Sequence, residues 1–434
     1  MRHLIAERLP ALTYPPYLRY WLASFASVGG SQVVTLGQGW LVFELTGSAW
    51  NLGLLGAAVA LPNIIVTLIG GVIADRFDKR IIMMTTSVLT AVMLALLAYL
   101  DWRETITLWQ VLAIAGVVSL ITGIDWPVRV AIYPHLVGRE HLMNAVALNA
   151  FIWQATRMAL PAVGGIVIAI GDTWMLFAAG AVGFFVMYLV MTGIHVHVHA
   201  MTVEGPLRQL LAGLSFIRHS PLFIALLAMT FAGMFFVSAY SQIMPIFADA
   251  IGGDERVYGY LVATGGLASV VGTIIASNFQ HHPRLGQVML MTALLTAFSA
   301  GLFGWAAMAA LFIPALVLTF LAQLFASVFM VTSMGVMQLN VPDALRGRVM
   351  GFHAIGYSLI PLGGLFLGGL TEWGGAGFAL TVGCLIYFLV IVLAGFRSTL
   401  IREWSGELKP ETERLNLSDR AATTEITEPD VAKS

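Results

Sequence analysis

"GGVIADRFDKR", residues 70–80, decides the fold of this chain, because it sets five charges in six positions between two long apolar runs. Charged residues make up only 10% of the 434 residues, whereas hydrophobic residues make up 59% and the mean hydropathy is +0.86. This composition lies far outside the range of soluble globular domains and is typical of an integral membrane protein. The charged stretch is therefore expected to be a short surface loop between two membrane spans.

Apolar windows recur along almost the whole sequence, and each approaches the roughly 20 residues that a helix needs to cross the hydrocarbon core. They cover residues 17–43, 50–74, 81–100, 106–127, 146–170, 173–195, 221–247, 257–278, 286–306, 309–337, 350–371 and 375–396. A backbone in lipid must satisfy its own polar groups, and continuous runs of this length do so only as α-helices. The sequence therefore predicts an all-α integral membrane protein with twelve transmembrane helices.

The positions of the cations predict the topology, since Lys and Arg near span ends collect on the cytoplasmic side. With the N-terminus inside, only Arg103 and Arg256 lie outside and Arg157 lies in a span, which leaves 19 of the 22 Lys and Arg on inside segments. Both termini are predicted to be cytoplasmic, in a multi-pass protein of the cell inner membrane. The net charge of −1 indicates no nucleic-acid partner, and the single Cys384 indicates no disulfide. No metal or cofactor is expected.

The spans divide into two halves that echo each other at an offset of about 200 residues, as in transporter folds built from repeats. "PAVGG" at 161–165 corresponds to "PLGG" at 361–364. The predicted organisation is a six-helix bundle over 1–195, a cytoplasmic linker with an amphipathic segment over 196–220, a second six-helix bundle over 221–397, and a disordered cytoplasmic tail over 398–434.

Polar residues in the first, fourth, seventh and tenth spans recur at steps of three and four, which places them on one face of each helix. Such stripes either join neighbouring helices or line an aqueous path. Each residue alone favours the first interpretation, whereas the four stripes together favour a central cavity. For a single aromatic side chain in a span, contact with lipid is the alternative to a place in the cavity wall. The predicted cavity lining is Ser27, Ser31, Thr35, Gln38, Trp40, Trp126, Trp153, Gln154, Phe235, Ser238, Tyr240, Gln242, Gln323 and Ser327.

The loop after the second span resembles the major facilitator superfamily signature G-x-x-x-D-R-x-G-R-R. The matching residues are Gly71, Asp75, Arg76, Lys79 and Arg80. Asp78 stands where the general pattern has Gly, and this Asp, with "PHLVGREHLMNAVALN" and "VPDALRGRVMG", resembles the branch of enterobactin exporters and macrolide efflux proteins. The resemblance covers about residues 15–396. It implies two pseudo-symmetric bundles and a latch in which Asp75 holds the cytoplasmic side closed in the outward-open state.

A second stretch, "RMALPAVGG" at 157–165, is similar to the antiporter motif G-P-x-x-G-G of efflux members. Pro161, Gly164 and Gly165 match it, while Leu160 replaces the Gly before Pro. Glycines at this spacing permit close helix approach and a bend. The resemblance implies that this helix supports export-type conformations.

Energy coupling must use an ion gradient or the substrate gradient, because the sequence contains no nucleotide-binding loop of the type G-x-x-x-x-G-K-[ST]. The candidate coupling residues are Asp125, Arg129, Arg157 and Glu44. Charges within the membrane are functional hypotheses by default. For Asp125 and Arg129, a local ion pair four residues apart is an alternative of equal weight. For Glu44 the alternative is a water-exposed helix end. Glu372 also lies at a span end, and no coupling role is predicted for it.

These observations predict a monomeric secondary transporter that exports an amphipathic drug or siderophore in exchange for protons by alternating access. Its expected partners are a small-molecule substrate, protons and the lipid bilayer. A transporter of lysolipids or other lipid-like cargo, or an importer, is the alternative within transport, and a membrane sensor without transport is the alternative outside it. An enzyme is not expected, because the spans hold no cluster of catalytic spacing.

Overall fold

The computed structural model describes residues 9–76, 78–194, 214–279, 282, 284–342, 345, 349–353 and 356–397. Every regular element within these ranges is helical. The predicted tail over 398–434 and most of the predicted linker lie outside the described residues.

The first half forms six long helices in chain order. They are α2 (Pro15–Thr46), α3 (Ala49–Arg76), α4 (Lys79–Trp102), α5 (Leu108–Leu136), α6 (Leu142–Ile170) and α7 (Thr173–Thr192), with short 3₁₀ turns η1 (Pro10–Thr13) and η2 (Arg139–His141). The second half contains α9 (Pro221–Ala232), η3 (Gly233–Val237), η4 (Ser238–Ile243), α10 (Met244–Ala250), α11 (Glu255–Ser277), α12 (Leu285–Met308), α13 (Phe312–Asn340), η5 (Gly356–Ser358), α15 (Leu359–Gly374) and α16 (Ala376–Arg397).

Eleven helical stretches in the described part of the chain are long and apolar enough to cross a membrane. The remaining predicted span, α2, has 32 residues, or about 48 Å at 1.5 Å per residue, which exceeds the hydrocarbon core of about 30 Å. It is not among the eleven because Ser, Thr, Gln and Gly interrupt its apolar residues. The prediction of an all-α membrane fold is confirmed.

The ends of the helices follow from local sequence. Pro15 starts α2, where a missing N–H costs nothing. Gly47 ends α2 with a φ of 59°, a left-handed conformation that favours glycine. Asp78 caps α4 by accepting a hydrogen bond from the backbone N–H of Arg80 at 2.8 Å. Asp254 caps α11 in the same way from the N–H of Arg256 at 3.1 Å.

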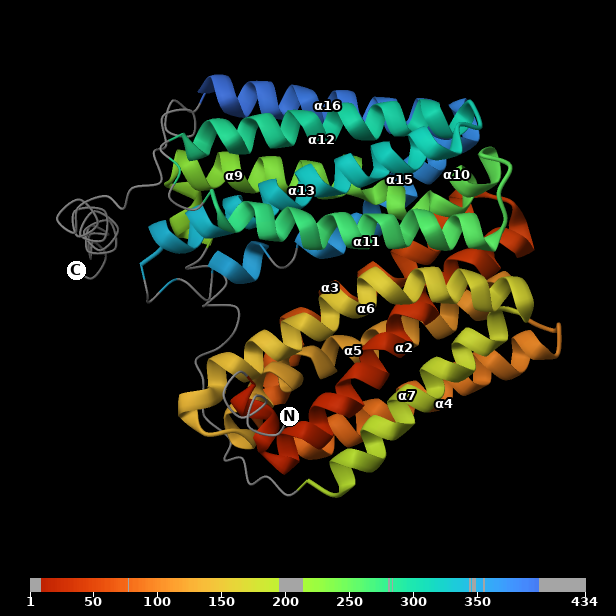
Figure 1. Cartoon of the computed structure of the whole chain (residues 1–434), viewed down its shortest axis with the longest axis vertical. Coiled ribbons are helices and arrows are strands. Elements are labelled where there is room, and N and C mark those ends of the chain that lie inside the picture. Colours follow the sequence, from red (N-terminus) through yellow and green to blue (C-terminus); the bar gives the residue numbers. More distant parts are fainter. Residues whose placement is uncertain are drawn as a thin grey trace, which may run out of the picture.

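The helices pack as two groups. Within the first, α2 packs against α6 and α7, and α3 against α5; within the second, α13 packs against α11 and α12, and α12 against α16. The groups meet where α3 runs beside α15 and α6 runs beside α11. Figure 1 shows them as two layers that approach at one end and separate toward the other. We call the end where α2 begins the near end, and the end where α2 finishes the far end.

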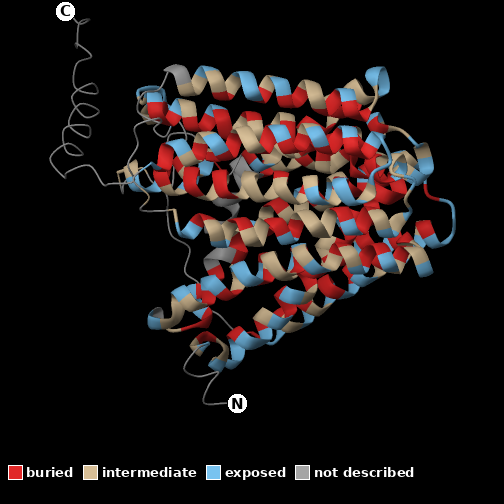
Figure 2. Cartoon of the chain, turned by 45° about the horizontal axis from the view of Figure 1, so that its top comes forward, coloured by how far each residue is buried: buried red, intermediate tan, exposed pale blue. Residues whose placement is uncertain are grey.

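The outer surface is apolar, as expected of helices that face lipid. Figure 2 shows buried residues between the helices and exposed residues along their outward faces. Large side chains such as Phe298, Trp305 and Leu385 are more than half exposed. Apolar surface on this scale would be a liability in water, whereas in a bilayer it contacts acyl chains.

The seventh span is a broken helix, in contrast to the continuous helix predicted over 221–247. Between α9 and α10 the backbone forms a π-helical turn and then a 3₁₀ stretch, and the N–H of Ser238 donates to the carbonyl of Gly233. A Cβ atom at Gly363 would collide with the carbonyl oxygen of Phe235, and one at Gly383 with that of Phe236. Neighbouring helices therefore pack directly on the irregular backbone. In a membrane, such backbone is tolerated only inside protein or along a cavity.

Candidate functional site

A cavity of about 560 Å³ lies between the two bundles. Of the fourteen residues predicted to line it, the structure places nine in its wall: Ser27, Ser31, Thr35, Gln38, Trp126, Trp153, Tyr240, Gln242 and Gln323. Both halves of the chain therefore contribute, as expected for a path along the interface between two repeats. The role of these residues in binding stays a prediction.

Two predicted aromatic residues pack against other rings and are not among the residues that line the cavity. Trp40 is buried and stacks on Tyr258 of α11 with ring centroids 5.8 Å apart, so it joins the two bundles. Phe235 belongs to an aromatic cluster with Phe236 and Phe366, at centroid distances of 4.9 and 5.8 Å. An aromatic side chain in a span finds such ring partners as readily as a cargo.

Three predicted polar residues also lie outside the wall. The hydroxyl of Ser327 donates to the carbonyl of Ser269 at 2.9 Å, which joins α13 to α11. This is the alternative role of a polar stripe, a hydrogen bond between helices. Gln154 and Ser238 are likewise described but are not among the residues that line the cavity.

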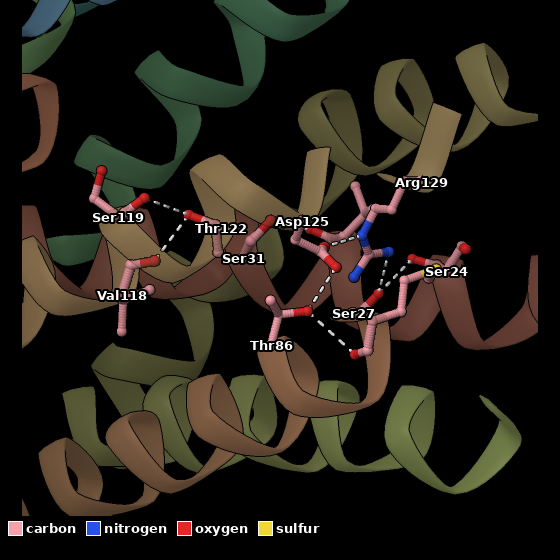
Figure 3. A network of polar contacts seen from close by, with 11 residues as sticks. Ser24, Ser27, Ser31, Thr86, Val118, Ser119, Thr122, Asp125 and Arg129 are labelled. Atoms are coloured by element: carbon pink, nitrogen blue, oxygen red, sulfur yellow. Dashed lines mark hydrogen bonds and ion pairs between the residues drawn. The ribbon is translucent and has the colours of Figure 1, made fainter. Parts of the chain in front are cut away.

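A buried ion pair forms one part of the cavity wall, where α2, α4 and α5 meet (Figure 3). Asp125 and Arg129 of α5 pair with each other, and only 5% and 7% of their surfaces are exposed. The hydroxyl of Thr86 donates to Oδ1 of Asp125 at 2.8 Å, and Nη1 of Arg129 donates to Oγ of Ser27 at 3.1 Å. Both charges are thus paired and also hydrogen-bonded to neighbouring helices, which a buried ion pair requires.

The other two coupling candidates lie in different surroundings. Arg157 of α6 lines the cavity, is classed as exposed, and makes no hydrogen bond or ion pair with the described residues. Glu44 lies near the far end of α2, where it is exposed and outside the cavity wall. The position of Glu44 fits the alternative of a water-exposed helix end.

The bundles touch through backbone at the far end of two helix pairs. A Cβ atom at Gly56 of α3 would lie 2.5 Å from the carbonyl oxygen of Pro361 of α15. A Cβ atom at Gly259 of α11 would lie 2.8 Å from the carbonyl oxygen of Pro161 of α6. Each bundle therefore contributes one glycine and one proline carbonyl, and the two contacts correspond at the offset of about 200 residues. They hold the two bundles together beside the cavity, whose wall includes Gly56, Pro161 and Pro361.

The glycines of the predicted helix-bend motif lie in the same region, and α6 continues as helix through Pro161. A Cβ atom at Gly165 would lie 2.5 Å from the carbonyl oxygen of Glu255 of α11, in the other bundle. One at Gly164 would lie 2.6 Å from a methyl group of Leu36 of α2, in the same bundle. In this structure the two glycines of the motif allow α6 to approach α11 and α2 closely.

Glu372, for which no role was predicted, makes a polar contact between the bundles at the far end. Its Oε1 accepts from the hydroxyl of Ser48 at 2.6 Å and from the backbone N–H of Trp50 at 3.2 Å. Those groups belong to the start of α3, so a carboxylate of the second bundle caps a helix of the first. No local pattern marks this contact, because its partners are more than 300 positions apart.

The predicted latch is only partly described. The helix α3 continues through Gly71 and Asp75 to Arg76, whose side chains lie outside the described set. Lys79 and Arg80 open α4.

Arg80 has a clear structural role within its own bundle. Its Nε donates to the carbonyl of Met191 at 3.0 Å and its Nη2 to that of Thr192 at 2.6 Å, both at the end of α7. A cation there satisfies carbonyls that lack helical partners and complements the helix dipole. The latch function of the motif stays a prediction.

Two helical bundles around a shared cavity, closed at one end by contacts that correspond between the halves, define a secondary transporter of the major facilitator type. The chain belongs to the transmembrane secretion effector family of the major facilitator superfamily, whose model matches residues 10–421. The superfamily resemblance of the sequence is thereby confirmed, and the chain is a multi-pass membrane transporter and not an enzyme.

Relatives and solved structures agree with this assignment. The chain is 26% identical over 406 residues to the enterobactin exporter EntS of Shigella flexneri, covering 89% of this chain and 94% of the relative. EntS of Escherichia coli O157:H7 matches to the same extent. The nucleoside transporter NupG superimposes with a TM-score of 0.70 at 13% identity, covering 90% of this chain and all of that one. A bacterial ferroportin homologue in its inward-facing state gives 0.69 at 13% identity, covering 87% and 98%.

Proposed function

We propose that this transporter exports an amphipathic organic compound across the bacterial inner membrane in exchange for protons. The observation that carries the proposal is the place of the Asp125–Arg129 ion pair: the local pair expected as the alternative is present, and it lies buried in the wall of the central cavity. Asp125 is the carboxylate among the described lining residues, so it is the group there that a proton can neutralise.

Protonation of Asp125 gives the network two states. The ionised carboxylate holds Arg129 and accepts from Thr86. The neutral acid leaves Arg129 uncompensated in a site where it is 7% exposed, which favours rearrangement of α2, α4 and α5 around it. A carboxylate whose charge decides the packing of three helices is suited to couple proton movement to conformation.

The cavity supports an amphipathic cargo. Its volume of about 560 Å³ falls within the 300–1,000 Å³ typical of small-molecule sites. Its wall combines Trp126, Trp153 and aliphatic side chains with the amides of Gln38, Gln242 and Gln323. Because the similar protein of Shigella flexneri is named an enterobactin exporter, a siderophore is the first cargo to test.

Export by alternating access also fits the geometry. The excess of cations on the inside segments favours cytoplasmic termini, which makes the near end cytoplasmic. Closure at the far end then corresponds to the inward-facing state, in which cargo enters from the cytoplasm. Separation of the glycine and Glu372 contacts would release it on the other side.

Everted membrane vesicles provide the test. The vesicles are acidified by respiration and the interior pH is followed with a quenched acridine dye, while enterobactin or an amphipathic drug is added. We expect cargo-dependent release of protons from vesicles with the wild-type chain and none with Asp125→Asn. The matched control, Glu44→Gln, removes a carboxylate outside the cavity and should behave as wild type. Proton release by Asp125→Asn at the wild-type rate would contradict the coupling role.

A further inference from the structure

The charges in the cavity wall do not cancel. Among the described lining residues three are charged: Asp125, Arg129 and Arg157. Asp125 and Arg129 form an ion pair and offset each other. Arg157 has no ion-pair or hydrogen-bond partner in the described part of the chain, so the described wall carries a net charge of plus one.

Arg157 is placed to meet a cargo. It belongs to α6 of the first bundle and lines the cavity together with Tyr240 and Gln323 of the second. Tyr240 belongs to the 3₁₀ stretch of the broken seventh span and lines the same cavity. The cation and the irregular backbone therefore line the same cavity, and transporters commonly bind their substrates beside such broken helices.

An aromatic surface adjoins this cation. Trp153 lies four residues before Arg157, hence on the same face of α6. Its ring meets that of Trp126 from α5 edge to face, with centroids 5.2 Å apart and planes at 82°. Both tryptophans line the cavity, and half of the surface of Trp126 is exposed. A flat apolar group can thus pack beside the guanidinium.

An arginine within a membrane span that lines a cavity and pairs with no described group is rare and is by default a candidate functional residue. Its planar fork of N–H donors matches a carboxylate or another oxyanion in a two-point contact, stronger than a neutral hydrogen bond. We infer that the cavity binds an organic anion, whose oxyanion pairs with Arg157 and whose aromatic body packs on Trp126 and Trp153. This inference rests on the proposed function, in that the cavity is the cargo site, and it adds the charge of the cargo.

The remaining wall fits the same ligand. The hydroxyl of Tyr240 lies 2.9 Å from that of Thr319, and Gln242 and Gln323 supply amide groups, so the second bundle offers neutral polar groups. A cationic cargo would find only Asp125 as a counter-charge among the described lining residues, and Asp125 already holds Arg129. The electrostatics of the described wall therefore favour an anion over a cation of the same shape.

Three probes that share a pyrene ring test the sign of the charge: 1-pyrenebutyrate, 1-pyrenebutanol and 4-(1-pyrenyl)butyltrimethylammonium. Binding to the full chain in zwitterionic nanodiscs is measured by energy transfer from tryptophan to pyrene, with empty nanodiscs as the blank. For the wild type we expect the butyrate to bind about tenfold or more tightly than the butanol, the effect of one charge-assisted contact. The ammonium probe should bind most weakly.

Substitutions then assign the preference to one residue. Arg157→Gln should abolish the preference for butyrate and leave the affinity for butanol unchanged, which also shows that the variant is folded. Arg157→Lys keeps the charge and should keep most of the preference. The matched control Arg256→Gln removes an exposed cation outside the cavity wall and should bind all three probes as wild type does.

Each other outcome overturns a defined part of the argument. Equal affinity for the three probes in the wild type, or a preference for butyrate that survives Arg157→Gln, would refute the anion site. Export with proton exchange would stand in that case, because its own test is proton release from vesicles. Failure of all three probes to bind the wild type would refute both the anion site and the cavity as an amphipathic cargo site.

Discussion

Removal of the Glu372 carboxylate should open the far end of the transporter. In the closed state this carboxylate accepts hydrogen bonds from the hydroxyl of Ser48 at 2.6 Å and the N–H of Trp50 at 3.2 Å. When the bundles part at the far end, both bonds are lost and water replaces them. The contact therefore stabilises only one of the two conformations, and Glu372→Ala shifts the balance toward the other.

The size of the shift follows from the kind of contact. Loss of a helix-capping side chain costs about 0.5–2 kcal/mol. Because Glu372 is exposed, solvent screens its charge and a value near the middle of that range, about 1 kcal/mol, applies. This corresponds to a change of about fivefold in the ratio of far-end-open to far-end-closed molecules. Glu372→Gln keeps an acceptor but loses the charge, and should produce a smaller shift.

Distances between spin labels at the far end measure this ratio. The labels are attached at Arg103→Cys in the first bundle and Leu311→Cys in the second, in a Cys384→Ala background. The ratio of the longer-distance to the shorter-distance population should be about five times larger in Glu372→Ala than with Glu372 present. Asp249→Ala is the matched control, since Asp249 is an exposed far-end carboxylate of the second bundle. Unchanged distances in Glu372→Ala, or an equal change in the control, would refute the role of Glu372.

Three further predictions follow from the contacts described above. Gly56→Ala places a Cβ 2.5 Å from a backbone carbonyl of the facing helix and should open the far end in the same distance measurement, whereas Gly335→Ala, with nothing within 4 Å, should not. Asp125→Asn leaves Arg129 buried without its partner and should lower the unfolding free energy by about 3–5 kcal/mol. In thermal unfolding, the double variant Asp125→Asn/Arg129→Met should recover the lost stability. A double variant no more stable than Asp125→Asn would contradict this account. Asp75→Asn should abolish transport with normal membrane insertion, and normal efflux by this variant would remove the latch hypothesis.

The positions of the spans could be predicted from the sequence because the bilayer fixes both their length and their composition. The window predicted over 81–100 corresponds to α4 (Lys79–Trp102), and the window over 286–306 to α12 (Leu285–Met308). Hydropathy cannot show that the seventh span is broken. Its irregular backbone depends on glycines of α15 and α16 that pack on its carbonyls.

The same break explains why the cavity was predicted better in the first half than in the second. The polar residues predicted from the first span, Ser27, Ser31, Thr35 and Gln38, all line the wall. In the seventh span Tyr240, Ser241 and Gln242 line it consecutively, which no face of a regular α-helix allows. A helical period therefore cannot identify the lining residues of this span, and Ser238, which that period selected, is not among them.

Contacts between the halves were beyond sequence analysis for another reason. Glu372 and Ser48 are 324 positions apart, and neither lies in a motif. The Trp40–Tyr258 stack likewise joins helices of different bundles. Residue type and spacing indicate which side chains share a face, but only the docking of the bundles decides which faces meet.

The contacts of Gly56 with Pro361 and of Gly259 with Pro161 concern the movement of the two bundles and not the recognition of a cargo. Each contact involves main chain on one side and the absence of a side chain on the other, so closure depends on backbone shape and not on the polar and aromatic side chains of the wall. Substitutions in the wall can therefore alter cargo preference while the gate keeps its fit. A designer could exchange the polar and aromatic wall residues for those of another transporter of the superfamily, provided that Gly56, Pro161, Gly259 and Pro361 stay in place.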